Sequence, residues 1–102
     1  MSQILGIGVI TQDNLSHIIG LAQATRSAGK QVKIFLTGDG VHLTQEARFT
    51  ELLGVGQVEI CRTSYDANGY QDQEIPGLPD EAFTSQFRHA EILEKCDRYI
   101  VL

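Results

Sequence analysis

The sequence predicts a single α/β domain, in which a mainly parallel β-sheet is covered by helices on both faces to give three layers. Apolar segments of strand length alternate along the chain with segments whose apolar residues recur at helical spacing, in the order βαβαβ(loop)αβ. Strands that alternate with helices form parallel sheets through right-handed crossovers. A length of 102 residues and an apolar content of 42% suit one core, so we expect one domain over residues 1–102.

The first half of the chain predicts two strand–helix units. Residues 4–10 form a nearly continuous apolar run, which is typical of a strand buried on both faces of a sheet. Asn14 is suited to cap the following helix, and Gly29 to end it. A second strand over residues 32–36 leads through a glycine-rich turn to a helix that we expect Thr44 to cap. The expected core-facing residues of the two helices are Leu15, Ile18, Ile19, Ala22, Ala47, Phe49, Leu52 and Leu53.

The second half predicts a third strand, a long loop, a helix and a last strand. The third strand covers residues 55–61, and the turn-forming residues in 63–79 predict a short helical turn followed by a loop. Long loops in compact domains are often functional. Helical spacing returns over residues 80–96, and residues 99–102 form the last strand. The expected core-facing residues of this helix are Phe83, Phe87, Ala90, Ile92 and Leu93.

Composition argues against several classes of partner. Eight Lys and Arg residues face thirteen Asp and Glu residues, for a net charge of -5, and the basic residues are scattered, so we expect no nucleic-acid binding. No apolar run approaches the ~20 residues that span a bilayer, and no export signal is apparent, so we expect a cytoplasmic protein without a membrane partner. The two cysteines are then expected to be free thiols. No spacing of His, Cys or carboxylates matches a metal site, and we expect none.

Ligands of open parallel sheets gather beyond the carboxyl ends of the strands. That rule selects residues 11–13, 37–42 and 61–64 as candidate site segments. Cys61 has the most specific chemistry among them, because a thiolate is a strong nucleophile and a sulfur acceptor. Arg62 and the turn near Ser64 are expected to favour the thiolate. The alternative is that Cys61 is a small buried hydrophobe at a strand end.

Other residues have weaker signals. His42 is a candidate general base or thiolate partner, with a solvated loop histidine as the alternative. Cys96 ends the last helix and is interpreted as structural, because a helix carboxyl terminus disfavours a thiolate. Gly6 and Gly8 lack the later glycine of a dinucleotide fingerprint and instead indicate close packing. His17 and His89 fall at polar positions in helix interiors. A second functional hypothesis is a binding module for a small anion or nucleotide, with ligand-reading residues Thr11, Thr37, Asp39 and Thr63.

Three stretches together resemble the DsrE/DsrF-like proteins, small α/β domains that include sulfur-relay subunits of bacterial sulfur oxidation and tRNA thiolation. They are the strand and turn at 34–41, the segment 58–64 with Asn68-Gly69 behind it, and the ending 96–102. The resemblance covers almost the whole chain and implies a flavodoxin-like fold. It also implies that Cys61, which closes the third strand, carries sulfur as a persulfide and needs no cofactor.

The resemblance further implies partner proteins and self-association. A carrier needs a sulfur-donor and a sulfur-acceptor protein, and the family implies trimers, hexamers or hetero-oligomers with related chains. A third hypothesis is an assembly subunit in which Tyr65, Tyr70 and Leu78 are contact residues, and the alternative is that they cover the chain's own core. Some relatives have a second cysteine where this chain has Ser64, and many have a basic residue in place of Asn68. Without the second thiol we expect single-thiol sulfur carriage and no dithiol redox cycling.

Overall fold

The sheet is five-stranded and all-parallel in the computed structural model, which describes residues 3–102. Its strands are β1 (Ile4–Val9), β2 (Gln31–Leu36), β3 (Gln57–Cys61), β4 (Phe83–Thr84) and β5 (Arg98–Val101). They lie in the order β4-β3-β2-β1-β5, and every neighbouring pair is parallel. This confirms the predicted fold class, with one strand more than the sequence predicts. All the carboxyl ends therefore meet at one edge of the sheet.

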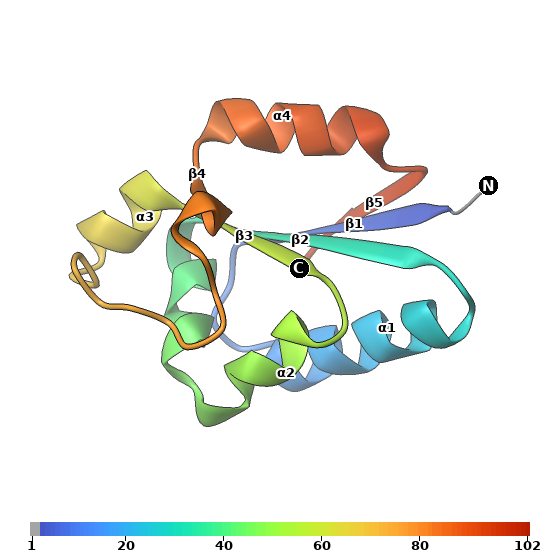
Figure 1. The fold of residues 1–102 in the computed structure, drawn as a ribbon, viewed down its shortest axis with the longest axis horizontal. Coiled ribbons are helices and arrows are strands. Elements are labelled where there is room, and N and C mark those ends of the chain that lie inside the picture. Colours follow the sequence, from blue (N-terminus) through green and yellow to red (C-terminus); the bar gives the residue numbers. More distant parts are fainter. Residues whose placement is uncertain (1–2) are drawn as a thin grey trace.

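Helices cover both faces of the sheet (Figure 1). On one face lie α1 (Leu15–Ser27) and α2 (Thr50–Leu53), and on the other lies α4 (Gln86–Lys95). The first three crossovers each move the chain one strand in the same direction, whereas the last returns from β4 to the far side of β1. Because crossovers are right-handed, that reversal places α4 on the opposite face. The remaining helix, α3 (Arg62–Ala67), follows β3 at the edge where the strands end.

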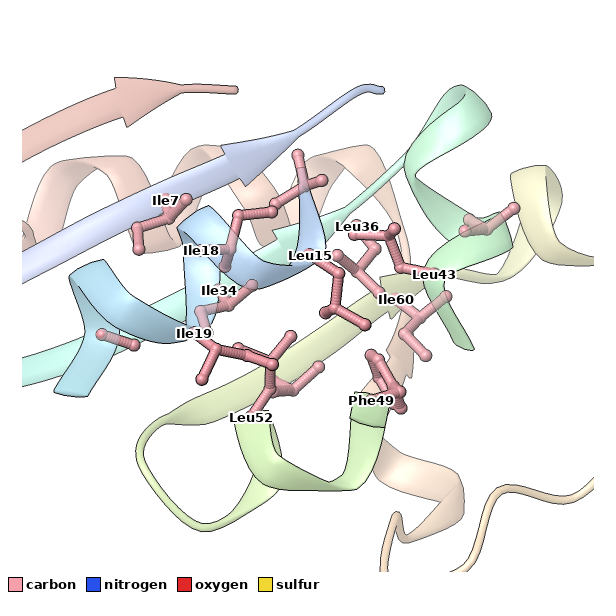
Figure 2. Packing of buried hydrophobic residues seen from close by; sticks show 14 of the residues in the cluster. Ile7, Leu15, Ile18, Ile19, Ile34, Leu36, Leu43, Phe49, Leu52 and Ile60 are labelled. Carbon is pink, nitrogen blue, oxygen red and sulfur yellow. The ribbon is translucent and has the colours of Figure 1, made fainter. Parts of the chain in front are cut away.

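The main hydrophobic core lies between the sheet and the α1–α2 layer (Figure 2). Ile18 and Ile19 of α1 are buried against Ile7, Ile34 and their neighbours on the central strands. Fully burying a side chain of this size contributes about 1.5–3 kcal/mol. The opposite face of the sheet has one covering helix and a smaller, more polar interior.

Gly6 and Gly8 explain how that second interior is built. A Cβ added at Gly8 would collide with the hydroxyl and ring of Tyr99, and one added at Gly6 would press on Tyr99 and on Cys96 Sγ. Tyr99 therefore lies across β1, and its hydroxyl is 2.8 Å from Nε2 of His89 in α4. The prediction that these glycines allow close packing is confirmed.

The predicted helix capped by Thr44 is wrong in form. The chain coils directly after β2 into a 3₁₀ helix, η1 (Gly38–Gln45), followed by a second one, η2 (Ala47–Phe49), and then the single turn of α2. Gly38 adopts a positive φ of 55°, which starts the coil at once. Thr44 lies inside η1, where its hydroxyl donates to the Val41 carbonyl instead of capping a helix. Of the four expected core residues, Phe49 and Leu52 are buried, Leu53 is half-buried and Ala47 is exposed.

The predicted helix over 80–96 is wrong in its first third. Residues Asp80–Ala82 form a short 3₁₀ helix, η3, and Phe83–Thr84 form β4. The α-helix starts only at Gln86, because Ser85 is extended and its hydroxyl accepts the Arg88 N–H as an N-cap. Of the five expected core residues, Ile92 is buried and Phe83 is half-buried, whereas Phe87, Ala90 and Leu93 are exposed.

Smaller boundary differences concern the strands and the first helix. β1 ends at Val9 and leaves Ile10 exposed, and β3 begins at Gln57 instead of residue 55. Asn14 occupies the cap position of α1, but its side chain donates to the Thr11 hydroxyl at 3.0 Å instead of capping the helix. Gly29 follows the end of α1 with the expected positive φ, here 80°. None of the helices within residues 3–102 has the length and apolar character needed to cross a membrane.

Candidate functional site

Cys61 is the last residue of β3 and lies where that strand passes directly into α3. Side chains alternate between the two faces of a strand. Val58 and Ile60 belong to the main core, whereas Glu59 and Cys61 lie on the face that α4 covers. Only 3% of Cys61 is exposed, so the thiol is buried beneath the polar side chains at the sheet edge.

Three hydrogen-bonding side chains surround this strand end. Thr37 follows β2, Ser64 lies in the first turn of α3, and Gln86 is the first residue of α4. Gln86 Nε2 donates to Thr37 Oγ1 at 2.8 Å, and Thr37 Oγ1 lies 3.2 Å from Ser64 Oγ. The Gly38 N–H donates to the same Ser64 oxygen at 3.0 Å. We call Thr37, Ser64 and Gln86 the donor triad.

The bonding pattern leaves a proton for the sulfur. Thr37 accepts a hydrogen bond from Gln86, and Ser64 accepts one from Gly38, while each hydroxyl has a single proton to donate. If Thr37 donates to Ser64, the Ser64 proton remains free, and the reverse direction frees the Thr37 proton. In either case one hydroxyl can donate to the Cys61 sulfur while remaining hydrogen-bonded itself.

The thiol pKa reflects this arrangement. Burial alone would raise the pKa of Cys61, because it disfavours the charged form. The donors beside the sulfur outweigh burial and hold the pKa below its ordinary value: the free proton of the Ser64 or Thr37 hydroxyl, the Ser64 backbone N–H and the Gln86 amide. The site therefore combines a nucleophilic sulfur with donors that stabilise its anion.

A model of the DsrE/DsrF-like family matches residues 8–102, which is nearly the whole chain. The chain belongs to the DsrE/DsrF-like family. DsrE-like proteins are generally associated with sulfur relay. A search of curated proteins finds no significant match to this chain.

In this DsrE/DsrF-like chain, Arg62 is adjacent to Cys61 in sequence but makes its own contacts elsewhere. Its guanidinium lies 4.2 Å from the centre of the Phe83 ring and 3.6 Å from Asp66 Oδ1. The groups that lower the Cys61 pKa are the neutral donors, and Arg62 is not one of them. The expected cationic support is therefore replaced by uncharged hydrogen-bond donors.

The other predicted site residues surround the centre without joining the donor triad. His42 Nδ1 is hydrogen-bonded to the Tyr70 hydroxyl, and Thr11 accepts from Asn14. Asp39 is exposed in η1, and Thr63 is exposed in α3. Within residues 3–102, no side-chain hydrogen bond links these four residues to Cys61 or to one another.

Cys96 has the opposite environment from Cys61. It is half-buried at the end of α4, where its Sγ donates to the Ile92 carbonyl at 3.1 Å. Burial raises its pKa, Lys33 opposes this shift, and Asp97 adds to it. Both cysteines are free, and their environments shift the two thiol pKa values in opposite directions, downward at Cys61 and upward at Cys96.

Tyr65 does not fit the predicted role of contact residue. It is fully buried, packs 4.9 Å from Phe83 between ring centres, and donates its hydroxyl to the Gln73 carbonyl. Tyr70 and Leu78 are half-buried against the core. Tyr65 therefore anchors the long loop to the domain.

Sequence reasoning missed Gln86. The helix expected from residue 80 onward placed Gln86 inside a helix and away from any strand end. If Phe83–Thr84 is recognised as a strand, the carboxyl-end rule also selects residues 85 and 86 as candidate site residues. The signal available was Ser85, a strong N-cap residue directly after an aromatic and a β-branched residue.

Proposed function

We propose that the protein is a sulfur carrier that accepts a sulfane sulfur as a persulfide on Cys61 and passes it to an acceptor thiol. The observation that carries the proposal is the donor triad around Cys61, which holds the pKa of a buried thiol below its ordinary value. A cysteine that served only as a small hydrophobe would need no such donors. Family membership supports the choice of sulfur chemistry.

The transfer needs neither a metal nor an organic cofactor. The Cys61 thiolate attacks the outer sulfur of a donor persulfide, R–S–SH. The donor S–S bond breaks as the new one forms, so that Cys61 becomes Cys–S–SH and the donor leaves as its thiolate, R–S⁻. Attack by an acceptor thiolate on the outer sulfur of the loaded protein reverses these roles and regenerates the Cys61 thiolate.

The donor triad suits both halves of this cycle. A thiolate is the attacking group in the first step and the leaving group in the second, and hydrogen bonds to the anion raise the thiolate fraction and make it a better leaving group. Cys61 is buried and Ser64 is half-buried, so a donor reaches the sulfur only when neighbouring side chains or the strand end move aside.

Protein partners follow from this proposal. Donor and acceptor proteins, and the expected trimer or hexamer, stay predictions that rest on the family. The alternative of an anion-binding module has weaker support, since only Thr37 of its four expected ligand-reading residues belongs to the triad.

The test is persulfide loading followed by intact-protein and peptide mass spectrometry. Wild-type protein and Cys96→Ser should each gain one sulfur atom from a low-molecular-weight persulfide, located on the peptide that contains Cys61. Cys61→Ser should gain none. Equal loading of Cys61→Ser, or loading that Cys96→Ser abolishes, would refute the proposal.

A further inference from the structure

An ion pair between a buried carboxylate, Glu59, and a partly exposed guanidinium, Arg88, lies beside the donor triad on the same face of the sheet. Glu59 precedes Cys61 by two residues on β3 and is 6% exposed, the one charged residue buried to this degree within residues 3–102. Its Oε1 accepts from Arg88 Nε at 3.3 Å, and Arg88 belongs to α4. This pair joins the helix that carries Gln86 to the strand that carries Cys61.

We propose that Arg88 and Glu59 are positioning residues, which hold the first turn of α4 so that Gln86 reaches Thr37 and the sulfur of Cys61. This inference rests on the proposed function for its biological meaning. The positioning role itself is argued from the contacts between α4 and β3 alone.

Arg88 is fixed at both its backbone and its side chain. Its N–H donates to the Ser85 hydroxyl at 3.3 Å, which caps α4, and its Nη1 donates to Glu91 Oε2 at 2.8 Å one turn later. The guanidinium is thus oriented by Glu91 on its own helix while Nε reaches across to Glu59. Planar guanidinium groups fix orientation in a way that a single ammonium does not.

The cost of burying Glu59 indicates a role beyond stability. Burying a carboxylate is expensive, and an apolar pair of similar size is often neutral or stabilising in its place. An apolar residue at position 59 would fill the space without fixing the direction of the Arg88 side chain, because apolar packing is non-directional. Gln86 lies two residues before Arg88 and donates to Thr37 at 2.8 Å. A hydrogen bond of that length requires the start of α4 to be held in one position, which directional contacts such as the ion pair provide.

The experiment is a double-mutant cycle read by the pH dependence of Cys61 alkylation in a Cys96→Ser background. Gln86→Ala should slow alkylation at pH 7.5 roughly threefold, because the Gln86 amide no longer helps to stabilise the Cys61 thiolate and the thiol pKa rises. Glu59→Leu/Arg88→Met, which removes both charges together, should raise the apparent thiol pKa and slow alkylation to a similar extent. Adding Gln86→Ala to that variant should produce little further change, because both act through the same hydrogen bond.

A matched control uses an Arg–Glu pair far from the site. Arg48 Nε is 2.7 Å from Glu51 Oε2 in an exposed pair of the same two residue types, so Arg48→Met/Glu51→Leu makes the same chemical change and should leave Cys61 alkylation unchanged. Arg88→Lys gives a second test if the neutral variant fails to fold: it retains the charge but loses the guanidinium geometry, so it should still slow alkylation. If Cys61 in the Arg88→Lys variant is alkylated as fast as in the wild-type protein, the inference is overturned.

Two results of the cycle would also overturn the inference. Effects that multiply would mean that the ion pair acts independently of Gln86, and an unchanged thiol pKa in the neutral pair variant would mean that it does not position the site. Alkylation requires no sulfur donor. A chain that shows the coupling but accepts no sulfur would therefore refute the proposed function and leave the positioning role intact.

Discussion

Gln86 and Thr37 lie 49 residues apart in the sequence, and their side chains meet in a 2.8 Å hydrogen bond at the carboxyl edge of the sheet. Gln86 follows β4 and Thr37 follows β2, and these are the two strands that flank β3 in the sheet. Cys61 ends the strand between them. The candidate site is thus assembled from three separate chain segments that the parallel topology brings to one edge.

Thr37→Val should weaken the site while retaining the shape of the side chain. It removes the hydroxyl that accepts from Gln86 and contacts Ser64, so the Cys61 pKa should rise and persulfide loading at pH 7.5 should slow roughly three- to tenfold. Stopped-flow measurement of loading over a pH series would give both quantities.

The control for this substitution is Thr25→Val. The Thr25 hydroxyl donates to the Leu21 carbonyl within α1 at 2.8 Å, so the same chemical change is made away from the site. Loading by this variant should match wild type. Equal slowing in both variants would show that the Thr37 effect is not specific to the thiol.

The residues of the site differ in how far the sequence reveals them. Cys61 ends a strand that apolar patterning predicts, and Thr37 and Ser64 follow such strands, so the carboxyl-end rule is enough to bring the three together. Gln86 follows a strand of two residues, which is too short to show alternation. Its contribution depends on tertiary contacts of α4, such as Arg88 with Glu59, that leave no local pattern.

The fold shows the same division. Long apolar runs and helical periodicity predict β1, α1, β2, β3 and β5 to within two or three residues. The apolar spacing of residues 45–53 predicts an α-helix capped by Thr44, yet only Thr50–Leu53 is α-helical, and the residues before it form 3₁₀ helices that begin at Gly38. The structure there depends on Gly40, where a Cβ would collide with the Val9 carbonyl, and such close approaches cannot be read from periodicity.

Ser64→Cys should convert the site into one that forms an intramolecular disulfide. The Ser64 side chain hydrogen-bonds toward the Cys61 sulfur from three residues along the chain, so a thiol there would lie within reach of the thiolate. Mild oxidation should remove both free thiols of this pair and block persulfide loading until a reductant is added. Thiol counting and peptide mapping would detect the bond.

Thr63→Cys is the control for that disulfide. Its side chain is exposed on the neighbouring position of α3, and it should keep a free thiol under the same oxidation. A Ser64→Cys protein that keeps all its thiols free would contradict the placement of Ser64 beside Cys61.

Gly8→Ala should destabilise the domain, because the new Cβ would collide with the hydroxyl and ring of Tyr99. Overpacking of this kind costs about 1–3 kcal/mol. Gly20→Ala is the matched control: no atom lies within 4 Å of its new Cβ, and the residue lies within α1. Urea unfolding should show the control to be more stable than wild type by up to about 1 kcal/mol. Equal unfolding midpoints for Gly8→Ala and wild type would contradict the packing of Tyr99 across β1.

His89 should make the fold sensitive to acid. Its ring stacks on Phe35 with centroids 4.3 Å apart, and burial lowers its pKa below the ordinary value of about 6.5. Above that value both the folded and unfolded chains hold His89 neutral. As the pH falls below it, the unfolded chain binds a proton that the folded chain does not, so the free energy of unfolding falls by at most about 1.4 kcal/mol per pH unit.

Replacement of His89 by glutamine tests this origin of acid sensitivity. Relative to His89→Gln, wild type should lose unfolding free energy between pH 6.5 and the lowered folded-state pKa, as measured by urea unfolding at several pH values. His17 is exposed on α1, so His17→Gln should retain the wild-type pH dependence. A His89→Gln protein with an unchanged pH profile would assign the acid sensitivity to other groups.

Single-turnover transfer of a labelled sulfur atom tests the carrier role most directly. The protein is loaded with one equivalent of labelled persulfide, the donor is removed, and an acceptor thiol is added while the label on the Cys61 peptide and on the acceptor is followed in time. We predict that label leaves Cys61 at the rate at which it appears on the acceptor, and that Cys61→Ser transfers none. Label that stays on Cys61, or that reaches the acceptor equally fast with Cys61→Ser in the mixture, would contradict the proposed carrier function.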